Sequence, residues 1–159
     1  MNLTTILSID PLSWASIETA LFCGGIIGLE RQLRGKPVGI RTSSLIVLGT
    51  YLFIATSAIA ASETGDPSRV IGQVVTGVGF LGAGVMLARD GIVMGVTSAA
   101  TIWSLAAIGV CISVIGEPVA IKLSLVVVAI LYGVDLLERH STSFTRGVHT
   151  KFSDWKRKE

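Results

Sequence analysis

Five apolar stretches take up most of this chain of 159 residues, and each is close to the length of a membrane-spanning helix. They run over residues 11–29, 42–61, 67–88, 96–115 and 118–137. About 20 helical residues cross the roughly 30 Å hydrocarbon layer of a bilayer. The stretches lack the alternation that the strands of a membrane barrel need, and only 15% of the residues are charged. The sequence therefore predicts an all-α integral membrane protein, with a transmembrane domain of about five helices over residues 11–137.

The positively charged residues predict the orientation of these helices. Eleven of the 13 Lys and Arg residues fall on one side of a five-span arrangement: four between residues 31 and 41, Arg89, and six between residues 139 and 158. Lys and Arg are enriched in loops that stay in the cytoplasm. We therefore expect an amino terminus on the outer side and a basic cytoplasmic tail over residues 138–159.

Acidic residues before prolines mark the expected helix starts on the outer side. Asp10-Pro11 and Asp66-Pro67 each place an N-cap acid before a proline at the first helical position, and Glu117-Pro118 resembles them. Proline is tolerated there because its missing N–H would have no partner within the helix, and the acid complements the positive helix end. The three starts open the first, third and fifth stretches, so they lie on the same side of the membrane.

The tail over residues 138–159 permits two interpretations. Phe144, Val148, Phe152 and Trp155 follow helical spacing beside several lysines, which is typical of an amphipathic helix on anionic lipid. Gly147 and the polar Ser-Thr-Ser run before it favour a disordered tail instead.

Glycine is concentrated in the third stretch, where five of the thirteen residues 72–84 are glycines. One interpretation is a tightly packed helix crossing, because small residues let helices approach closely in lipid. The other is a helix that is loosened near the middle of the bilayer, with freed carbonyls lining a cavity. The first interpretation assigns helix packing to Gly24, Gly28, Gly77, Gly79, Gly82 and Gly84.

Polar side chains at membrane depth are the candidates for function. Glu30, Arg31 and Arg41 lie at the cytoplasmic ends of the first two stretches. They either anchor the helices through ion pairs or form a cluster that binds an ion or a partner. Arg69 and Gln73, one turn apart near the outer end of the third stretch, form a second polar group.

The sequence contains no combination of residues suited to catalysis or to a structural metal. Its two cysteines, Cys23 and Cys111, each fall in an apolar run, and both histidines lie in the tail. No CxxC pair, nucleophile elbow or metal-spaced acidic cluster occurs. We therefore expect no enzyme activity, no metal and no cofactor.

Three ordered blocks of the sequence resemble the MgtC/SapB family of bacterial inner-membrane proteins. They are Gly-Leu-Glu30-Arg31 followed by Gly39-Ile-Arg41-Thr42, then Arg69 and Gln73 leading into the glycines of residues 77–84, then Gly95-Val-Thr97-Ser98-Ala-Ala with Trp103. The resemblance covers about residues 20–115 and adds Thr42 and Thr97 to the candidate functional polar cluster. Met94 and Ser98 depart from the family pattern, in which a basic residue and Thr are more usual.

The resemblance implies a multi-pass protein of the bacterial inner membrane with no established catalytic activity. Members are associated with adaptation to low magnesium and, in pathogens, with survival inside host cells. Modulation of other membrane complexes, including the F-type ATP synthase, has been proposed for the family. Many members carry a soluble carboxyl-terminal domain, and this chain resembles a short form without it.

Two functions follow as hypotheses. The first is a regulatory membrane protein that binds a partner. The partner is either a second copy of the protein or another inner-membrane complex, and membrane lipids surround the assembly. Its small size and its glycine faces motivate this hypothesis. The second is an oligomeric transporter or channel for an ion or small solute, motivated by a glycine-broken third helix, a polar fourth helix and charges at depth. Nothing in the sequence indicates binding of nucleic acid.

Overall fold

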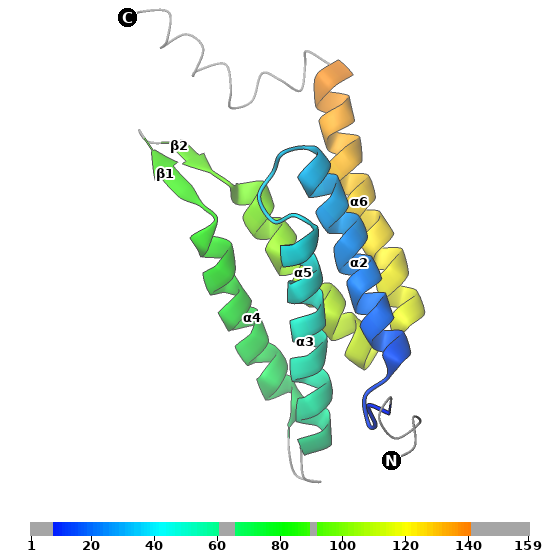
Figure 1. The fold of residues 1–159 in the computed structure, drawn as a ribbon. Helices are drawn as coiled ribbons and strands as arrows, with labels where there is room; N and C mark the ends of the chain where they lie inside the picture. Colours follow the sequence, from blue (N-terminus) through cyan, green and yellow to red (C-terminus); the bar gives the residue numbers. More distant parts are fainter. Residues whose placement is uncertain (1–7, 61–65, 90–91, 141–159) are drawn as a thin grey trace, which may run out of the picture.

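The computed structural model describes residues 8–60, 66–89 and 92–140, which form five helices and one short hairpin (Figure 1). The helices are α2 (Trp14–Leu33), α3 (Ile40–Ala60), α4 (Pro67–Gly84), α5 (Val96–Val114) and α6 (Glu117–His140). The strands β1 (Leu87–Arg89) and β2 (Ile92–Met94) pair antiparallel between α4 and α5. Successive helices alternate in direction, so α2, α4 and α6 all end where residues 34–39 and the hairpin lie. We call this the basic end, because it carries Arg31, Arg34, Lys36 and Arg41.

Three of these helices are long and apolar enough to cross a membrane, judged by length and composition. They are α3, α5 and residues Glu117–Leu137 of α6. Of the other two, α2 carries the charged residues Glu18, Glu30 and Arg31, and α4 contains many glycines together with Arg69 and Gln73. The predicted helical architecture is therefore confirmed, while the number of spans and their orientation stay predictions.

The acid–proline pattern predicts one helix start correctly and misplaces another. Asp66 is the N-cap of α4, and its carboxylate accepts a hydrogen bond of 2.9 Å from the Ser68 N–H. The start predicted at Asp10-Pro11 is wrong, because α2 begins at Trp14 after the N-cap Ser13. A turn precedes this start and holds Pro11 outside the helix.

The third apolar stretch also ends earlier than predicted. We expected a helix over residues 67–88, but α4 is continuous only to Gly84, and the chain then enters the β-hairpin. Gly95, just after β2, has φ +88, and a Cβ there would lie 2.3 Å from the Val85 carbonyl oxygen. The base of the hairpin thus requires both a left-handed backbone and a very close approach of two chain segments, and glycine permits both.

Glycines of α2 and α5 bring the helices of the core into backbone contact with α3. A Cβ on Gly24 would lie 2.5 Å from the Ser44 Cα, and one on Gly28 would lie 2.5 Å from the Ile40 Cα. On α5, a Cβ on Gly109 would lie 2.6 Å from the Val47 carbonyl oxygen. The core sits between these three helices, and its largest fully buried side chains include Ile27, Val47, Ile102 and Leu105.

Polar contacts at a constant sequence separation join α2 to α6. The Ser16 hydroxyl donates a 2.7 Å hydrogen bond to Glu117, 101 residues later, near the start of both helices. Arg34 contacts Asp135, also 101 residues later, at the basic end. The two helices therefore run parallel and in register. Apolar side chains of α6, such as Leu125 and Ile130, are more than half exposed.

Candidate functional site

The polar residues singled out from the sequence fall into separate places rather than one cluster. Glu30 and Arg31 are buried at the basic end of α2. Arg41, Thr42 and Gln73 line a groove between α3 and α4. The two remaining residues, Arg69 and Thr97, are exposed on α4 and α5.

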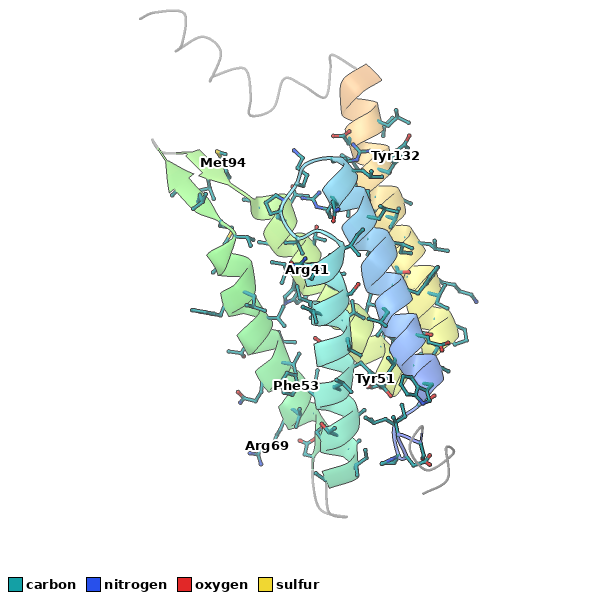
Figure 2. The ribbon with its side chains drawn as sticks, in the orientation of Figure 1. Arg41, Tyr51, Phe53, Arg69, Met94 and Tyr132 are labelled. Atoms are coloured by element: carbon teal, nitrogen blue, oxygen red, sulfur yellow. The ribbon has the colours of Figure 1, made fainter. Side chains whose placement is uncertain are left out.

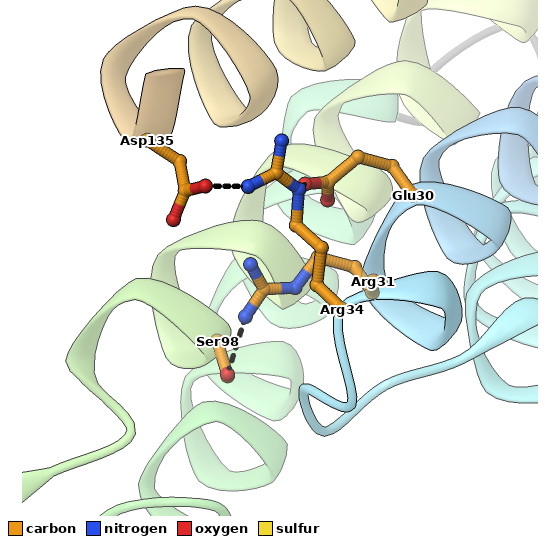
Figure 3. Close-up of polar contacts among 5 residues, drawn as sticks. All are labelled: Glu30, Arg31, Arg34, Ser98 and Asp135. Carbon is orange, nitrogen blue, oxygen red and sulfur yellow. Dashed lines mark hydrogen bonds and ion pairs between the residues drawn. The ribbon is translucent and has the colours of Figure 1, made fainter. Parts of the chain in front are cut away.

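The first place is a network of charges at the basic end, which we call the Arg34 cluster (Figure 3). It joins side chains from α2, α5 and α6, and its members are Glu30, Arg31, Arg34, Ser98 and Asp135. The Arg34 guanidinium lies between the two carboxylates, with its Nε 2.6 Å from the Glu30 Oε1 and its Nη1 on Asp135. Arg34 also stacks over the ring of Tyr132, 5.0 Å from the ring centroid, which adds a cation–π attraction.

Arg31, the residue after Glu30, completes the cluster by a contact with α5. Its Nη2 donates a 2.8 Å hydrogen bond to the Ser98 hydroxyl at the start of α5, and only 4% of the residue is exposed. Arg34 and its two carboxylates thus join α2 to α6, and Arg31 joins α2 to α5 through a neutral hydroxyl, while its Nε has no hydrogen-bond partner among the described residues. Buried charges that are paired in this way hold helices in one arrangement, and the loss of one partner leaves an uncompensated charge.

Glu30 is the least satisfied member of the Arg34 cluster. Its side chain is 7% exposed, and neither carboxylate oxygen has a directed hydrogen bond from the described residues. The short contact with the Arg34 Nε is an ion pair, because Coulomb attraction does not require the alignment of a hydrogen bond. A cavity of about 300 Å³ adjoins Glu30 and Arg34 on the α6 side. Arg34 is thus the counter-ion on which the burial of Glu30 depends.

The second place is the α3–α4 groove, a hollow of about 570 Å³ that follows the two helices lengthwise. Most of its lining is apolar, and Gly49 and Gly77 leave room in its middle because nothing approaches their Cβ positions within 4 Å. Arg41 lies at the basic end of α3, facing α4 (Figure 2). Gln73 lies on α4 toward the opposite end.

The other candidate residues lie outside both places. Arg69 is exposed near the start of α4 and points away from the bundle (Figure 2). Thr97 is exposed, and its backbone carbonyl accepts a hydrogen bond from the Thr101 hydroxyl. Neither residue joins the Arg34 cluster or lines the α3–α4 groove.

The helix-packing glycines likewise separate by helix. Gly24 and Gly28 lie at the backbone contacts of α2 with α3, and Gly82 lies 3.7 Å, measured from an added Cβ, from the Cβ of Ala99 on α5. Gly77, Gly79 and Gly84 have open space within 4 Å of their Cβ positions. Among the described residues, these three glycines of α4 therefore have no close neighbour at their Cβ positions.

Sequence reasoning missed the central part played by Arg34 and the contribution of Tyr132. In the sequence, Arg34 was used only as one of the basic residues that predict the orientation of the helices. It follows Glu30 by four residues, about one helical turn, and this spacing brings oppositely charged side chains together. Its contact with Asp135 spans 101 residues. Local spacing carries no signal for a contact of that kind.

Comparison with known proteins shows the family to which this chain belongs. Residues 17–140 match the MgtC family. This chain belongs to the MgtC family. The putative magnesium transporter YhiD of Escherichia coli strain K12 is 48% identical over 103 residues, covering 60% of this chain and 47% of that protein. Protein MgtC of Brucella abortus strain 2308 is 41% identical over 96 residues, covering 60% of this chain and 40% of that protein.

A third MgtC relative gives the same extent of similarity. Protein MgtC of Salmonella typhimurium strain 14028s is 42% identical over 95 residues, covering 60% of this chain and 40% of its own length. The matched part of this chain thus spans less than half of each of these MgtC-family relatives. No solved structure matches this MgtC-family chain.

Proposed function

We propose that this protein is a regulatory, partner-binding component of the bacterial inner membrane that takes part in adaptation to limited magnesium. The link to magnesium comes from the names of its relatives, protein MgtC and the putative magnesium transporter YhiD. The proposed topology is five spans with the amino terminus outside and the basic end in the cytoplasm. The excess of Lys and Arg at that end supports this orientation.

One observation carries the partner-binding proposal: the outer face of α4 is suited to a close helix contact and meets no helix among the described residues. Gly72, Thr76, Gly79 and Ala83 recur at helical spacing, and all four are exposed. Nothing lies within 4 Å of a Cβ added at Gly72 or Gly79. In lipid, small residues at this spacing let two helices approach and pack closely. We call these four residues the α4 small-residue face.

Exposed apolar side chains continue this face toward the basic end. Phe80 is 81% exposed on α4, and Leu87, Val93 and Met94 of the hairpin are each more than half exposed. In a bilayer, these side chains face either lipid or a partner helix. A partner on this surface would contact α4 within the membrane and the hairpin at its edge.

The transporter or channel hypothesis has less support from the geometry. It depended on a break in the glycine-rich third helix, and α4 is a continuous helix over Pro67–Gly84. At the basic end, the Glu30 and Asp135 carboxylates are both taken up by Arg34. We therefore place partner binding first.

The test compares substitutions on two faces of the bundle. Gly79→Leu fills the α4 small-residue face, and Gly133→Leu on α6 is the matched control, because a Cβ at either position meets nothing within 4 Å. Each variant is purified in mild detergent to test whether it is recovered in a complex. In a separate assay, each variant is expressed in a deletion strain, and growth in low magnesium is measured. We expect wild type and Gly133→Leu to be recovered in a stoichiometric complex and to support growth, and Gly79→Leu to lose both.

Two outcomes would count against the proposal. If the wild-type protein is a lone monomer that still supports growth, partner binding is not its function. If Gly79→Leu keeps both the complex and growth, the partner does not use α4.

Cysteine labelling tests the proposed topology. The native Cys23 and Cys111 are buried, so an impermeant maleimide reports on an introduced cysteine. Ala60→Cys at the end of α3 should react in intact spheroplasts, and Lys36→Cys at the basic end should react only after the membrane is opened. The reverse pattern would invert the orientation, and reaction of both in intact spheroplasts would rule out a membrane between them.

A further inference from the structure

We propose that the α3–α4 groove is a binding site for one anionic phospholipid, with the phosphate at Arg41 and an acyl chain along the groove. The groove lies on the side of α4 opposite the α4 small-residue face, because Val70, Val74 and Leu81 line the groove and Gly72 and Gly79 do not. The proposal is therefore independent of the partner-binding function.

The first argument is the charge at the mouth of the groove. Among the described residues that line it, Arg41 alone is charged. The guanidinium is exposed, and within the described ranges it makes no hydrogen bond or ion pair. Its neighbours at the same end differ, since Arg31 bonds Ser98 and Arg34 pairs with two carboxylates. Arg41 is thus a cation with free donors, which suits a phosphate.

The second argument is the position of Arg41 along its helix. Arg41 and Thr42 lie in the first turn of α3, where the helix dipole favours an anion and the Thr42 hydroxyl adds a donor. α3 has 21 residues, which is about 30 Å of helix and matches the thickness of the hydrocarbon layer. Arg41 therefore falls at headgroup level. The cytoplasmic leaflet, on which we place this end, carries anionic lipid that basic pockets between helices bind.

The third argument is the length and lining of the groove. Arg41 and Phe53 mark its extent on α3 and are 12 residues apart, or about 18 Å of helix. One leaflet contributes half of a hydrocarbon layer that is about 30 Å thick. An acyl chain attached to a phosphate at Arg41 would thus reach the end of the groove near Phe53. The volume of about 570 Å³ lies within the range of about 300–1,000 Å³ that is usual for ligand sites.

Native mass spectrometry of the full chain, released from nanodiscs, tests the proposal directly. The nanodiscs contain either palmitoyl-oleoyl phosphatidylglycerol or the zwitterionic palmitoyl-oleoyl phosphatidylcholine. We expect one phosphatidylglycerol to stay bound to each protein chain and phosphatidylcholine to be lost. Equal retention of the two lipids would overturn the proposal.

Two pairs of variants separate the phosphate contact from general effects of charge and volume. Arg41→Gln removes the cation of the groove, and Lys36→Gln removes a cation of the same end outside the groove. We expect Arg41→Gln to weaken phosphatidylglycerol binding by about fivefold, the effect of about 1 kcal/mol per basic residue near anionic lipid, and Lys36→Gln to have little effect. If the two variants weaken binding equally, Arg41 is not the headgroup site.

Gly77→Leu fills the groove and leaves Arg41 in place, whereas Gly72→Leu adds the same volume to the opposite face of α4. We expect Gly77→Leu to expel the lipid and Gly72→Leu to retain it. The reverse result would overturn the proposal.

Gln73→Leu distinguishes a lipid from a partner helix as the occupant of the groove, since an acyl chain makes no hydrogen bond with the Gln73 amide. If Gln73→Leu abolishes a bound species that proves to be protein, the groove holds a partner helix and the lipid proposal fails.

Discussion

The Ser16 hydroxyl and the Glu117 carboxylate share a 2.7 Å hydrogen bond across 101 residues of chain. Arg34 and Asp135 meet at the other end of the same two helices with the same separation. Ser16 and Arg34 are 18 residues apart, which is five turns at about 3.6 residues per turn. Both residues therefore lie on one side of α2, and α6 follows that side without slipping in register.

The first prediction concerns Arg34 and the two carboxylates with which it pairs, Glu30 and Asp135. Arg34→Ala should lower the free energy of unfolding by about 3–5 kcal/mol, because it leaves the buried Glu30 without a counter-ion. Asp135→Ala should lower the free energy of unfolding by about 1 kcal/mol or less, because the ion pair of Arg34 with Glu30 remains and the Asp135 side chain is 31% exposed. Reversible unfolding in mixed micelles measures both values.

The double variant Glu30→Gln/Arg34→Ala provides the control for this prediction. It removes the uncompensated charge, so it should recover more than half of the stability that Arg34→Ala loses. Equal losses for Arg34→Ala and Asp135→Ala would show that Glu30 does not depend on Arg34.

The second prediction concerns the contact of α2 with α3. Gly24→Ala places a Cβ 2.5 Å from the Ser44 Cα, so the helices must separate, and we expect a loss of about 1–3 kcal/mol. Gly25→Ala is the matched control, because nothing lies within 4 Å of its Cβ, and alanine there should be neutral or stabilising by up to about 1 kcal/mol. Thermal melting in detergent ranks the two variants. A neutral Gly24→Ala would mean that the helices are further apart than the structure has them.

The third prediction concerns the base of the β-hairpin. Gly95 and Gly35 both have a left-handed backbone, but only Gly95 has an atom within 4 Å of an added Cβ. Gly35→Ala should therefore show strain alone, about 1–2 kcal/mol. Gly95→Ala should lose more, because it also displaces Val85 at the end of α4. Hydrogen exchange of residues 85–95 should increase in Gly95→Ala and stay unchanged in Gly35→Ala, and equal exchange in the two variants would contradict the close approach.

The fourth prediction concerns the pH dependence of the α4 N-cap. The hydroxyl of Ser68 and then its backbone N–H hold the pKa of the Asp66 carboxyl below its ordinary value. A lowered pKa in the folded state means that the carboxylate stabilises the fold above the ordinary Asp pKa of about 3.9. This contribution is lost as the pH falls through the lower pKa of the folded state.

A carbon-detected NMR titration of Asp66 measures this shift. Ser68→Ala should move the pKa of Asp66 part of the way back to the ordinary value, because it removes the hydroxyl and keeps the N–H. An Asp66 carboxyl that titrates at or above the ordinary value in the wild type would refute the cap.

Patterns that repeat along one helix were readable from the sequence. The apolar stretches located all five helices to within a few residues at most ends, because burial in lipid requires runs of about that length. Asp66-Pro67 identified a helix start because the cap and the proline act on adjacent backbone groups. The hairpin after Gly84 was not predicted, because its strands have three residues each and continue the apolar character of α4.

Contacts between distant elements were not readable in the same way. Glu30, Arg31 and Arg41 are close in sequence, yet the first two enter the Arg34 cluster while Arg41 faces the α3–α4 groove. The side to which each residue turns depends on how α2 and α3 pack at Gly24 and Gly28. Spacing along the chain does not contain that information.

The register between α2 and α6 has a consequence for the order of biosynthesis. Ser16 and Arg34 emerge from the ribosome 101 residues before the carboxylates of α6 that they contact. At about 5–20 residues per second, that interval is roughly 5–20 s. During this time α2 and Arg34 exist without the α6 carboxylate that Arg34 contacts. Completion of α6 is thus the step that supplies the partners of Ser16 and Arg34 and joins α2 to its last described neighbour.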